Sequence, residues 1–316
     1  MNMQPHLPLP AASLRHFIDL SDWDGERIRK LLKEAGRLKK AHAAGKSKPL
    51  LQGRVLGLIF EKPSLRTRVS FQAGMAQLGG TAIFLTDIDT GLGKRETLPD
   101  IARTVSQFVD AVVLRTYRHE TVEQFARWSS CPVINGLSDY AHPCQALGDL
   151  LTLSEVSGGK LDGRTVVFVG DGNNVARSLA LACGKVGVQF VLSAPDGYGF
   201  DAHFLDVYRD QLATLPVQEP DPQRAVAAAD VIYTDVWASM GQEAQADERR
   251  RCFAAYQVND ALLARAPARA RVMHCLPAHR GEEITDDVLD GPQSVAFEQA
   301  GNRMHAQKAL LLWVMG

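Results

Sequence analysis

Short apolar runs alternate with stretches of helical periodicity along nearly the whole chain. Runs rich in Val, Ile, Leu and Phe lie at residues 54–60, 81–85, 111–115, 131–135, 165–170, 189–192, 231–233 and 272–274, with a further candidate strand at 294–297. Amphipathic segments lie among them, at residues 21–40, 66–78, 98–108, 143–155 and 174–186. Because consecutive parallel strands need a crossover, which is usually a helix, the alternation predicts an α/β fold with mainly parallel sheets flanked by helices.

The length of the chain suits two such units. Its 316 residues correspond to two domains at about 150 residues each. The polar turn at residues 157–163 (Ser-Gly-Gly-Lys-Leu-Asp-Gly) is the best boundary. We therefore expect a first domain over residues 1–156 and a second domain from residue 157 onward.

Charge and cysteine usage limit the classes of partner and the cellular compartment that we expect. The chain has 35 Lys and Arg against 36 Asp and Glu, so it has no strong basic field and we expect neither nucleic acid nor a membrane as a partner. A small-molecule substrate is the better interpretation. Five singly spaced cysteines indicate reduced thiols and a cytoplasmic protein. The apolar segment 309–315 is far shorter than the ~20 residues of a membrane span, and we expect no export signal.

In parallel sheets, ligands bind beyond the carboxyl ends of the strands, so the loops that leave strands are the candidate sites. Residues 64–68 (Ser-Leu-Arg-Thr-Arg) follow one strand and open a helix, where hydroxyls, guanidiniums and backbone N–H groups favour a phosphate. The alternative is an N-cap at Ser64 with solvated arginines. Arg115 ends a second strand and offers another cation, although most arginines only form surface salt bridges.

Residues 142–145 (His-Pro-Cys-Gln) enter a further helix. Pro143 suits a first helical turn, and His142 before it can donate to a carbonyl oxygen. Gln145 lies near the same face with both a donor and an acceptor. A structural cap is the alternative reading of this pair.

Residues 170–175 (Gly-Asp-Gly-Asn-Asn-Val) begin like a dinucleotide fingerprint. Val175 stands where the third glycine belongs, and the next strand does not end in an acidic ribose ligand, so a nicotinamide cofactor is disfavoured. Asn173 and Asn174 can instead hold the carboxylate or amine of an amino acid, with helix capping as the alternative.

Two later strand ends carry further candidates. Asp235 can pair with an ammonium group, or it can simply initiate a turn. His274, Cys275 and His279 do not make a convincing zinc site, since structural zinc takes four ligands, and a catalytic thiol needs an oriented base. We expect no metal, and a buried structural role for Cys275 stays open.

Four motifs taken in order resemble the signature set of the ornithine carbamoyltransferases, within the aspartate/ornithine carbamoyltransferase family: residues 64–68, 142–145, 235–241 (Asp-Val-Trp-Ala-Ser-Met-Gly) and 274–277 (His-Cys-Leu-Pro). The resemblance runs from about residue 14 to residue 313. It implies a carbamoyl-phosphate domain over residues 1–156, an ornithine domain over 157–298, and a helix over 299–316 that packs back on the first domain. It also implies ornithine rather than aspartate as the acceptor, no cofactor, and a homotrimer or a multiple of trimers.

The same resemblance implies roles for individual residues. Carbamoyl phosphate is held by Ser64, Leu65, Arg66, Thr67, Arg115, His142, Gln145, Cys275, Leu276 and Arg303. Within that set, His142, Gln145 and Arg115 contact the carbamoyl oxygen. Ornithine is held by Asn174, Asp235, Ser239 and Met240, with Cys275 and the Leu276 carbonyl around its side-chain amine. The residues implied to be catalytic are Arg66, Arg115, His142, Asp235 and Cys275.

Two positions depart from the family pattern. Leu65 replaces the commoner threonine, but a backbone N–H can donate there without a hydroxyl. Gly91 stands where many relatives carry a Gln or His that reaches the phosphate of a neighbouring subunit, so Lys94 or Arg95 is the candidate substitute.

The resemblance implies transfer of the carbamoyl group of carbamoyl phosphate to L-ornithine, which gives L-citrulline and phosphate. A carbamoyltransferase for another acceptor, such as putrescine or an N-acylated ornithine, is the alternative within this class. A nicotinamide dehydrogenase and a non-catalytic amino-acid-binding protein are the alternatives from other classes.

Overall fold

The computed structural model describes residues 14–92, 95–238 and 243–316. The chain divides into two compact units. Among the described residues, the first unit comprises those of 14–19, 37–144 and 307–316, and the second comprises those of 20–36 and 145–306. Helices run through three of the four points of division: α1 (Gly25–Ala43), α6 (Pro143–Val156) and α13 (Ala296–Met315).

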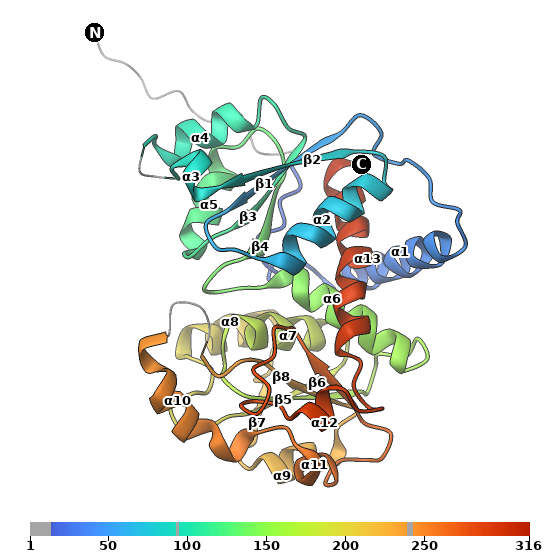
Figure 1. Cartoon of the computed structure of the whole chain (residues 1–316), viewed down its shortest axis with the longest axis vertical. Coiled ribbons are helices and arrows are strands. Elements are labelled where there is room, and N and C mark those ends of the chain that lie inside the picture. Colours follow the sequence, from blue (N-terminus) through green and yellow to red (C-terminus); the bar gives the residue numbers. More distant parts are fainter. Residues whose placement is uncertain (1–13, 93–94, 239–242) are drawn as a thin grey trace. The chain divides into compact units, whose positions relative to one another are not determined.

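A four-stranded parallel sheet forms the centre of the first unit (Figure 1). Its order is β2-β1-β3-β4. The strands are β1 (Val55–Phe60), β2 (Thr81–Thr86), β3 (Ala111–Arg115) and β4 (Val133–Leu137). The helices of this unit are α2 (Leu65–Gln77), α3 (Asp87–Thr90), α4 (Leu98–Val105) and α5 (His119–Trp128).

The inner strands of this sheet are apolar on both faces, which explains the helical cover. Every residue of β3 is buried, as are five of the six residues of β1. Because the side chains on both faces of these strands are buried, helices must cover both faces of the parallel sheet. Ile59, Val112 and Leu114 share one core cluster with Phe125 of α5.

A five-stranded parallel sheet forms the second unit, in the order β7-β6-β5-β8-β9. The strands are β5 (Thr165–Val169), β6 (Gln189–Ser193), β7 (Val217–Gln218), β8 (Val231–Thr234) and β9 (Arg271–His274). Its remaining helices are α7 (Asn174–Lys185), α8 (Ala202–Leu212), α9 (Pro222–Ala225), α10 (Ala246–Phe253), α11 (Asp260–Leu263) and α12 (Asp286–Leu289), with short 3₁₀ turns at Val226–Ala228, Glu243–Gln245 and Ala254–Tyr256. The α/β fold predicted from the sequence is therefore confirmed.

The expected strand at residues 294–297 is wrong. Only a single bridge joins Ser294 to Val272, and α13 begins at Ala296. The segment 296–300 (Ala-Phe-Glu-Gln-Ala) continues the helical pattern of the C-terminal helix, so the apolar pair Val295 and Ala296 marks a helix entry rather than a strand. The predicted final helix is correct but starts three residues earlier than expected.

The last turns of α13 belong to the first unit. Leu310 and Leu311 are fully buried there, and Lys308 Nζ donates to Gln77 Oε1 of α2 at 2.9 Å. Burial lowers the pKa of the Lys308 ammonium. In the part of the chain that the structure describes, no helix combines the length and apolarity needed to cross a membrane.

Candidate active site

The first sheet reverses its strand order between β1 and β3, and the phosphate motif leaves the sheet there. The chain passes from β1 to β2 on one side and reaches β3 on the other side, so the ends of β1 and β3 form a topological switch point. Phe60 and Arg115 are partners in the ladder, and Glu61 N donates to Arg115 O at 2.8 Å. The 64–68 motif and Arg115 each follow a strand, as the sequence predicted, and the structure shows that these two strands are neighbours.

Ser64 is the N-cap of α2. Its Oγ accepts from Thr67 N at 3.2 Å, so the capping interpretation is correct. Capping does not exclude a ligand, because the start of a helix carries several backbone N–H groups and one cap satisfies only some of them. Arg68 is engaged along the helix, with its guanidinium 3.8 Å from the Phe84 ring centroid and its Nε donating to Gln72.

Three further predicted residues of the first unit are buried, while Arg66 is half-buried. Thr67 is fully buried, Arg115 is 6% exposed and His142 is 5% exposed. Pro143 begins α6 directly after His142, as expected. Tight packing holds such side chains in few rotamers, which is the preorganisation that a binding site needs. Leu65, in contrast, is 73% exposed.

The second sheet has its own switch point between β5 and β8, and Asp235 is the centre of the groups there. Asn173, the N-cap of α7, accepts from Val175 N at 2.9 Å and donates from Nδ2 to Asp235 Oδ2 at 3.0 Å. Cys275 Sγ donates to Asp235 Oδ1 at 2.9 Å. The loops after β5, β8 and β9 therefore converge on one carboxylate, while Asn174 is the first residue of α7.

The contact between Cys275 and Asp235 limits what the thiol can do. An S–H that donates to a carboxylate is a neutral hydrogen-bond donor, and the adjacent negative charge disfavours the thiolate that a nucleophile requires. Cys275 is 8% exposed. Its geometry fits an orienting group better than a covalent catalyst.

His274 organises the turn that carries Cys275 and Leu276. The ring is fully buried, and its Nδ1 accepts from Leu276 N at 2.8 Å. Its Nε2 therefore carries the proton and donates to Glu283 Oε1 at 3.0 Å. The turn also holds Leu276 at φ 57, in the left-handed region that is unfavourable for a residue with a Cβ.

Gln145 and Arg303 are both deeply buried in the second unit. Gln145 is 1% exposed and donates from Nε2 to Asp149 Oδ1 at 2.8 Å. Arg303, in α13, is 2% exposed. A Cβ added to Gly148 would lie 3.2 Å from Arg303 Cα, so the two helices approach closely because this position is glycine.

The sequence did not predict the residues that form a hydrogen-bonded group with Gln145. Asp149, Tyr233 and Gln299 form a buried hydrogen-bonded group with it. Burial raises the pKa of the Asp149 carboxyl to about 7, although hydrogen bonds from Gln145, Gln299 and Tyr233 and the charge of Arg303 oppose the rise. The signal available in the sequence was an acid four residues after Gln145 within an apolar helix.

Some predicted residues fall outside the described part of the chain: Ser239, Met240 and Lys94. Gly91 ends α3 with φ 54, and Arg95 is well exposed and lies 3.6 Å from the Glu96 carboxylate. The segment before Ser239 is held by Arg249, whose Nη1 donates to Trp237 O at 2.8 Å and to Asp171 Oδ2 at 2.6 Å.

Protein partners account for the one cluster of metal-ligand atoms found among the described residues. His279, Glu282 and Glu283 place ligand atoms within 4.8 Å of one another. Glu283 Oε1 already accepts from His274 and from His279 N, and Glu282 accepts from Arg250 Nε at 2.9 Å. The cluster is therefore explained without an ion.

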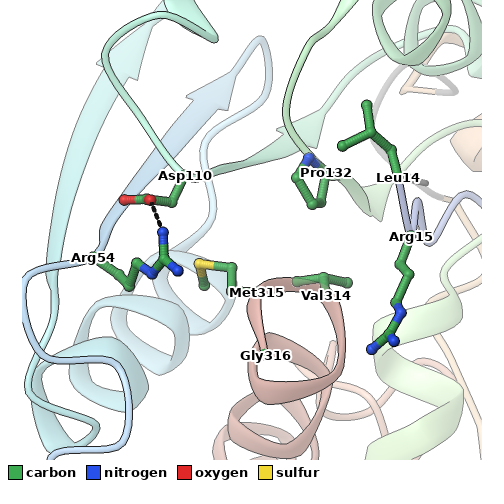
Figure 2. Close-up of a pocket in the computed structure, with 8 residues that line it drawn as sticks. All are labelled: Leu14, Arg15, Arg54, Asp110, Pro132, Val314, Met315 and Gly316. Atoms are coloured by element: carbon green, nitrogen blue, oxygen red, sulfur yellow. Dashed lines mark hydrogen bonds and ion pairs between the residues drawn. The ribbon is translucent and has the colours of Figure 1, made fainter. Parts of the chain in front are cut away.

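A pocket of about 280 Å³ lies elsewhere in the first unit, beside the end of α13 (Figure 2). It contains none of the predicted site residues. Figure 2 shows Arg54 paired with Asp110 at its edge, and Arg15 donates to Trp313 O. Both cations in its lining thus already have protein partners.

Comparison with known proteins agrees with the motifs. Residues 15–155 match the model of the aspartate/ornithine carbamoyltransferase carbamoyl-P binding domain, and residues 162–314 match that of the Asp/Orn binding domain. The chain is 49% identical to an ornithine carbamoyltransferase of Anoxybacillus flavithermus over 99% of both chains. It is 50% identical to an anabolic ornithine carbamoyltransferase of Pyrococcus furiosus over 96% of both chains.

Solved structures give the same result. The ornithine carbamoyltransferase structure from Pyrococcus furiosus superposes with a TM-score of 0.92 at 48% identity, covering 98% of this chain and 99% of that one. The structure from Thermus thermophilus gives a TM-score of 0.86 at 40% identity, covering 98% of this chain and all of that one. With both domain models matched and such relatives over nearly its full length, the chain belongs to the aspartate/ornithine carbamoyltransferase family.

Proposed function

We propose that this protein is an ornithine carbamoyltransferase, which transfers the carbamoyl group of carbamoyl phosphate to the side-chain amine of L-ornithine. The observation that carries the proposal is the position of the motif residues at the switch point of each sheet: Arg115 and the 64–68 loop lie at one, and Asp235, which accepts from Cys275, lies at the other. The full-length relatives named ornithine carbamoyltransferase support the same activity.

The first unit supplies the groups that bind the phosphoryl end of carbamoyl phosphate. We assign the phosphoryl oxygens to Ser64, Arg66, Thr67 and Arg115, with a backbone contact at Leu65. The carbamoyl oxygen is assigned to Arg115 and His142. Donors fixed around this oxygen stabilise the negative charge that develops on it as the amine attacks, and preorganised donors are usually the largest single contribution to such a reaction.

The hydrogen bond from Gln145 to Asp149 refines the assignment of Gln145. Its amide Nε2 donates to Asp149 Oδ1 at 2.8 Å, so the nitrogen side of the amide faces Asp149. Its Oε1 is buried and, among the described residues, has no hydrogen-bond partner. We therefore assign Gln145 Oε1 to the carbamoyl NH₂ group instead of the carbamoyl oxygen expected from the resemblance. Arg303, Cys275 and Leu276 complete the carbamoyl contacts in the proposal.

The second unit supplies the acceptor site. We assign ornithine to Asn174, Asp235, Ser239 and Met240, with Cys275 and the Leu276 carbonyl near the amine that reacts. The charge of Asp235, on which Asn173 and Cys275 converge, suits the ammonium groups of a diamino acid. Ornithine's side-chain amine, like that of lysine, has a pKa near 10, so the site must favour its neutral form for attack.

The reaction balances without a further reactant. The neutral amine forms an N–C bond to the carbamoyl carbon, and the C–O bond to phosphate breaks. The departing phosphate accepts the proton that the amine loses. Much of the acceleration comes from holding both substrates together, an effect worth up to about 7–11 kcal/mol.

The wider assignments belong to the same proposal. We propose a cytoplasmic, cofactor-free enzyme of arginine biosynthesis, assembled as a homotrimer or a multiple of trimers. The relative from Pyrococcus furiosus, named anabolic, supports the biosynthetic role. We further propose that residues 1–156 bind carbamoyl phosphate, that 157–298 bind ornithine, and that 299–316 return to the first domain, with the two domain matches as support. Light scattering should give a mass divisible by three chains.

An acceptor panel with carbamoyl phosphate tests the activity. L-ornithine, putrescine, N-acetylornithine and L-aspartate are each incubated with the purified full chain, and carbamoylated product and phosphate are quantified together. We expect L-citrulline and phosphate in equal amounts from ornithine alone at a substantial rate. A preference for another acceptor would change the substrate, and absence of turnover with all four would refute the carbamoyltransferase assignment.

A further inference from the structure

Asp149 is a fully enclosed acid that the proposed mechanism does not use. It lies in α6 with 1% exposure and accepts hydrogen bonds from three different elements. Gln145 Nε2 and Gln299 Nε2 donate to Oδ1 at 2.8 and 2.6 Å, and Tyr233 OH donates to Oδ2 at 3.2 Å. All four residues belong to the second unit.

The orientation of this group is fixed from the backbone. His274 N, which can only donate, is 2.9 Å from Gln299 Oε1, so the amide nitrogen of Gln299 must face Asp149. Asp149 Oδ1 therefore accepts from Gln299. Because Gln145 contacts the same oxygen, the Gln145 amide must turn its nitrogen, not its oxygen, toward Asp149. One backbone N–H of β9 thus determines, through two side chains, which atom Gln145 presents.

The same group reaches both strand ends that carry predicted site residues. Tyr233 is two residues before Asp235 in the chain, and His274 directly precedes Cys275. Gln299 Nε2 also lies 3.1 Å from Tyr233 OH, which closes a triangle with Asp149. The charge of Arg303, one helical turn after Gln299, acts on Asp149 as well.

We propose that Asp149 is a positioning residue for carbamoyl transfer: it fixes the Gln145 amide with its oxygen toward the carbamoyl group and ties that amide to the strand ends that carry Asp235 and Cys275. This inference rests on the proposed function and adds a residue that acts through Gln145 without contacting either substrate.

The cost of the arrangement argues against a purely structural role. Burial makes the charged form of the Asp149 carboxyl costly, and its pKa stays raised to about 7 although three hydrogen bonds and the charge of Arg303 oppose the rise. The charged and titratable groups around the acid are Tyr233 on β8, Arg303 on α13 and Cys183 on α7. Among these, Arg303 alone is a cation that the carboxylate can balance.

A double-mutant cycle tests the inference on the full chain with carbamoyl phosphate as the varied substrate. Asp149→Leu should lower kcat/KM for carbamoyl phosphate about 100-fold, and Gln145→Ala by a similar factor. The double variant should be no worse than Gln145→Ala, because the acid acts through that amide. Asp149→Asn keeps one oxygen that can accept from both amides, so it should recover most of the activity.

Thr152→Val is the matched control. Thr152 lies three residues further along α6, and its hydroxyl accepts from Asn302 Nδ2 of α13 at 3.0 Å, so this variant also removes a buried link between the two helices. We expect lower stability but a kcat/KM within about twofold of the wild type. A loss equal to that of Asp149→Leu would show that any weakened helix contact is enough, and would overturn the inference.

The outcomes separate the two proposals. A wild-type protein that transfers no carbamoyl group refutes the proposed function. An active wild type with additive losses in the double variant, or with full activity in Asp149→Leu, refutes the positioning role alone. If Asp149→Leu does not fold, Asp149→Asn alone tests the inference: a loss of kcat/KM as large as that of Gln145→Ala would overturn it, because the asparagine oxygen can still accept from both amides.

Discussion

At the residue scale, the site is built from side chains whose hydrogen-bonding role is determined by groups that can only donate or only accept. Cys275 faces a carboxylate and so must donate, and His274 accepts from a backbone N–H and so carries its proton on Nε2. Each such constraint removes a chemical role that the residue type alone would allow. For Cys275 the role removed is that of a nucleophile.

Cys275→Ser tests that conclusion. A serine hydroxyl can still donate to Asp235, so we expect kcat/KM for ornithine to fall by no more than about tenfold, which corresponds to about 1.4 kcal/mol. Cys183→Ser serves as the cysteine control, because Cys183 is buried in α7 and has no assigned role. Steady-state citrulline formation is the measurement, and a thousandfold loss specific to Cys275→Ser would restore the nucleophile hypothesis.

The raised pKa of Asp149 predicts an unusual dependence of stability on pH. Its folded-state pKa is about 7, against an ordinary value of 3.8, so between these values the folded chain holds a proton that the unfolded chain has released. The free energy of unfolding therefore falls as pH rises through this window. Asp149→Asn lacks the titration, so the stability of the wild type relative to this variant should decline by about 1 kcal/mol per pH unit between pH 5 and 6.5.

Urea unfolding of both proteins at pH 5.0, 5.75 and 6.5 checks this prediction, because the remaining titrations are shared and cancel in the difference. A constant difference between the two proteins across that range would mean that the carboxyl titrates normally.

At the element scale, close approach between helices is as important as hydrogen bonding. Gly148→Ala would place a Cβ 3.2 Å from Arg303 Cα and 3.3 Å from Arg303 N, so α13 must shift by a few tenths of an ångström. We expect about 1–3 kcal/mol of destabilisation from overpacking and about a tenfold loss of kcat/KM for carbamoyl phosphate as Arg303 moves. Denaturant unfolding and steady-state kinetics measure the two effects.

Gly36→Ala in α1 is the control for the same chemical change. A Cβ there meets nothing within 4 Å, so the variant should be stabilised by about 0.5–1 kcal/mol with unchanged kinetics. Equal kinetic losses in both variants would contradict the steric account.

The sequence predicted elements well where burial was continuous and poorly where it was not. Strands such as β1 and β3 were recognised because both faces are apolar, and α2 and α6 were recognised from their amphipathic pattern. Helices of four residues, such as α11 and α12, are too short to show a period. The sequence predicted a strand at the helix entry near Ala296 because Val295, Ala296 and Phe297 form a short apolar run.

At the scale of the whole molecule, the order of the four motifs along the chain predicted the family better than any single motif did. The two switch points bring together strand ends 55 and 65 residues apart in the chain. The sequence predicted sites at these strand ends because the carboxyl ends of parallel strands meet at one edge of a sheet. The partnership of Asp149 with Gln299 spans 150 residues between two helices, and no local pattern specifies it. Such contacts depend on how helices pack, which a single sequence does not reveal.

The stability that a bound ligand adds to the whole molecule tests the proposed phosphate site of the first unit without a measurement of turnover. A ligand that binds only the folded chain adds a stability of RT ln(1 + [L]/Kd), which is about 2.7 kcal/mol at one hundred times Kd. Inorganic phosphate, the proposed product, should therefore raise the Tm of the wild type in proportion to the logarithm of its concentration. The rise should be much smaller in Arg66→Ala, because a guanidinium that can bind phosphate through two N–H groups is lost.

Arg68→Ala is the matched control: it removes an arginine two residues away that stacks on Phe84, and we expect its phosphate-induced shift to equal that of the wild type. Equal shifts in all three proteins would place phosphate away from the 64–68 motif, because the Arg66 guanidinium would then contribute nothing to its binding.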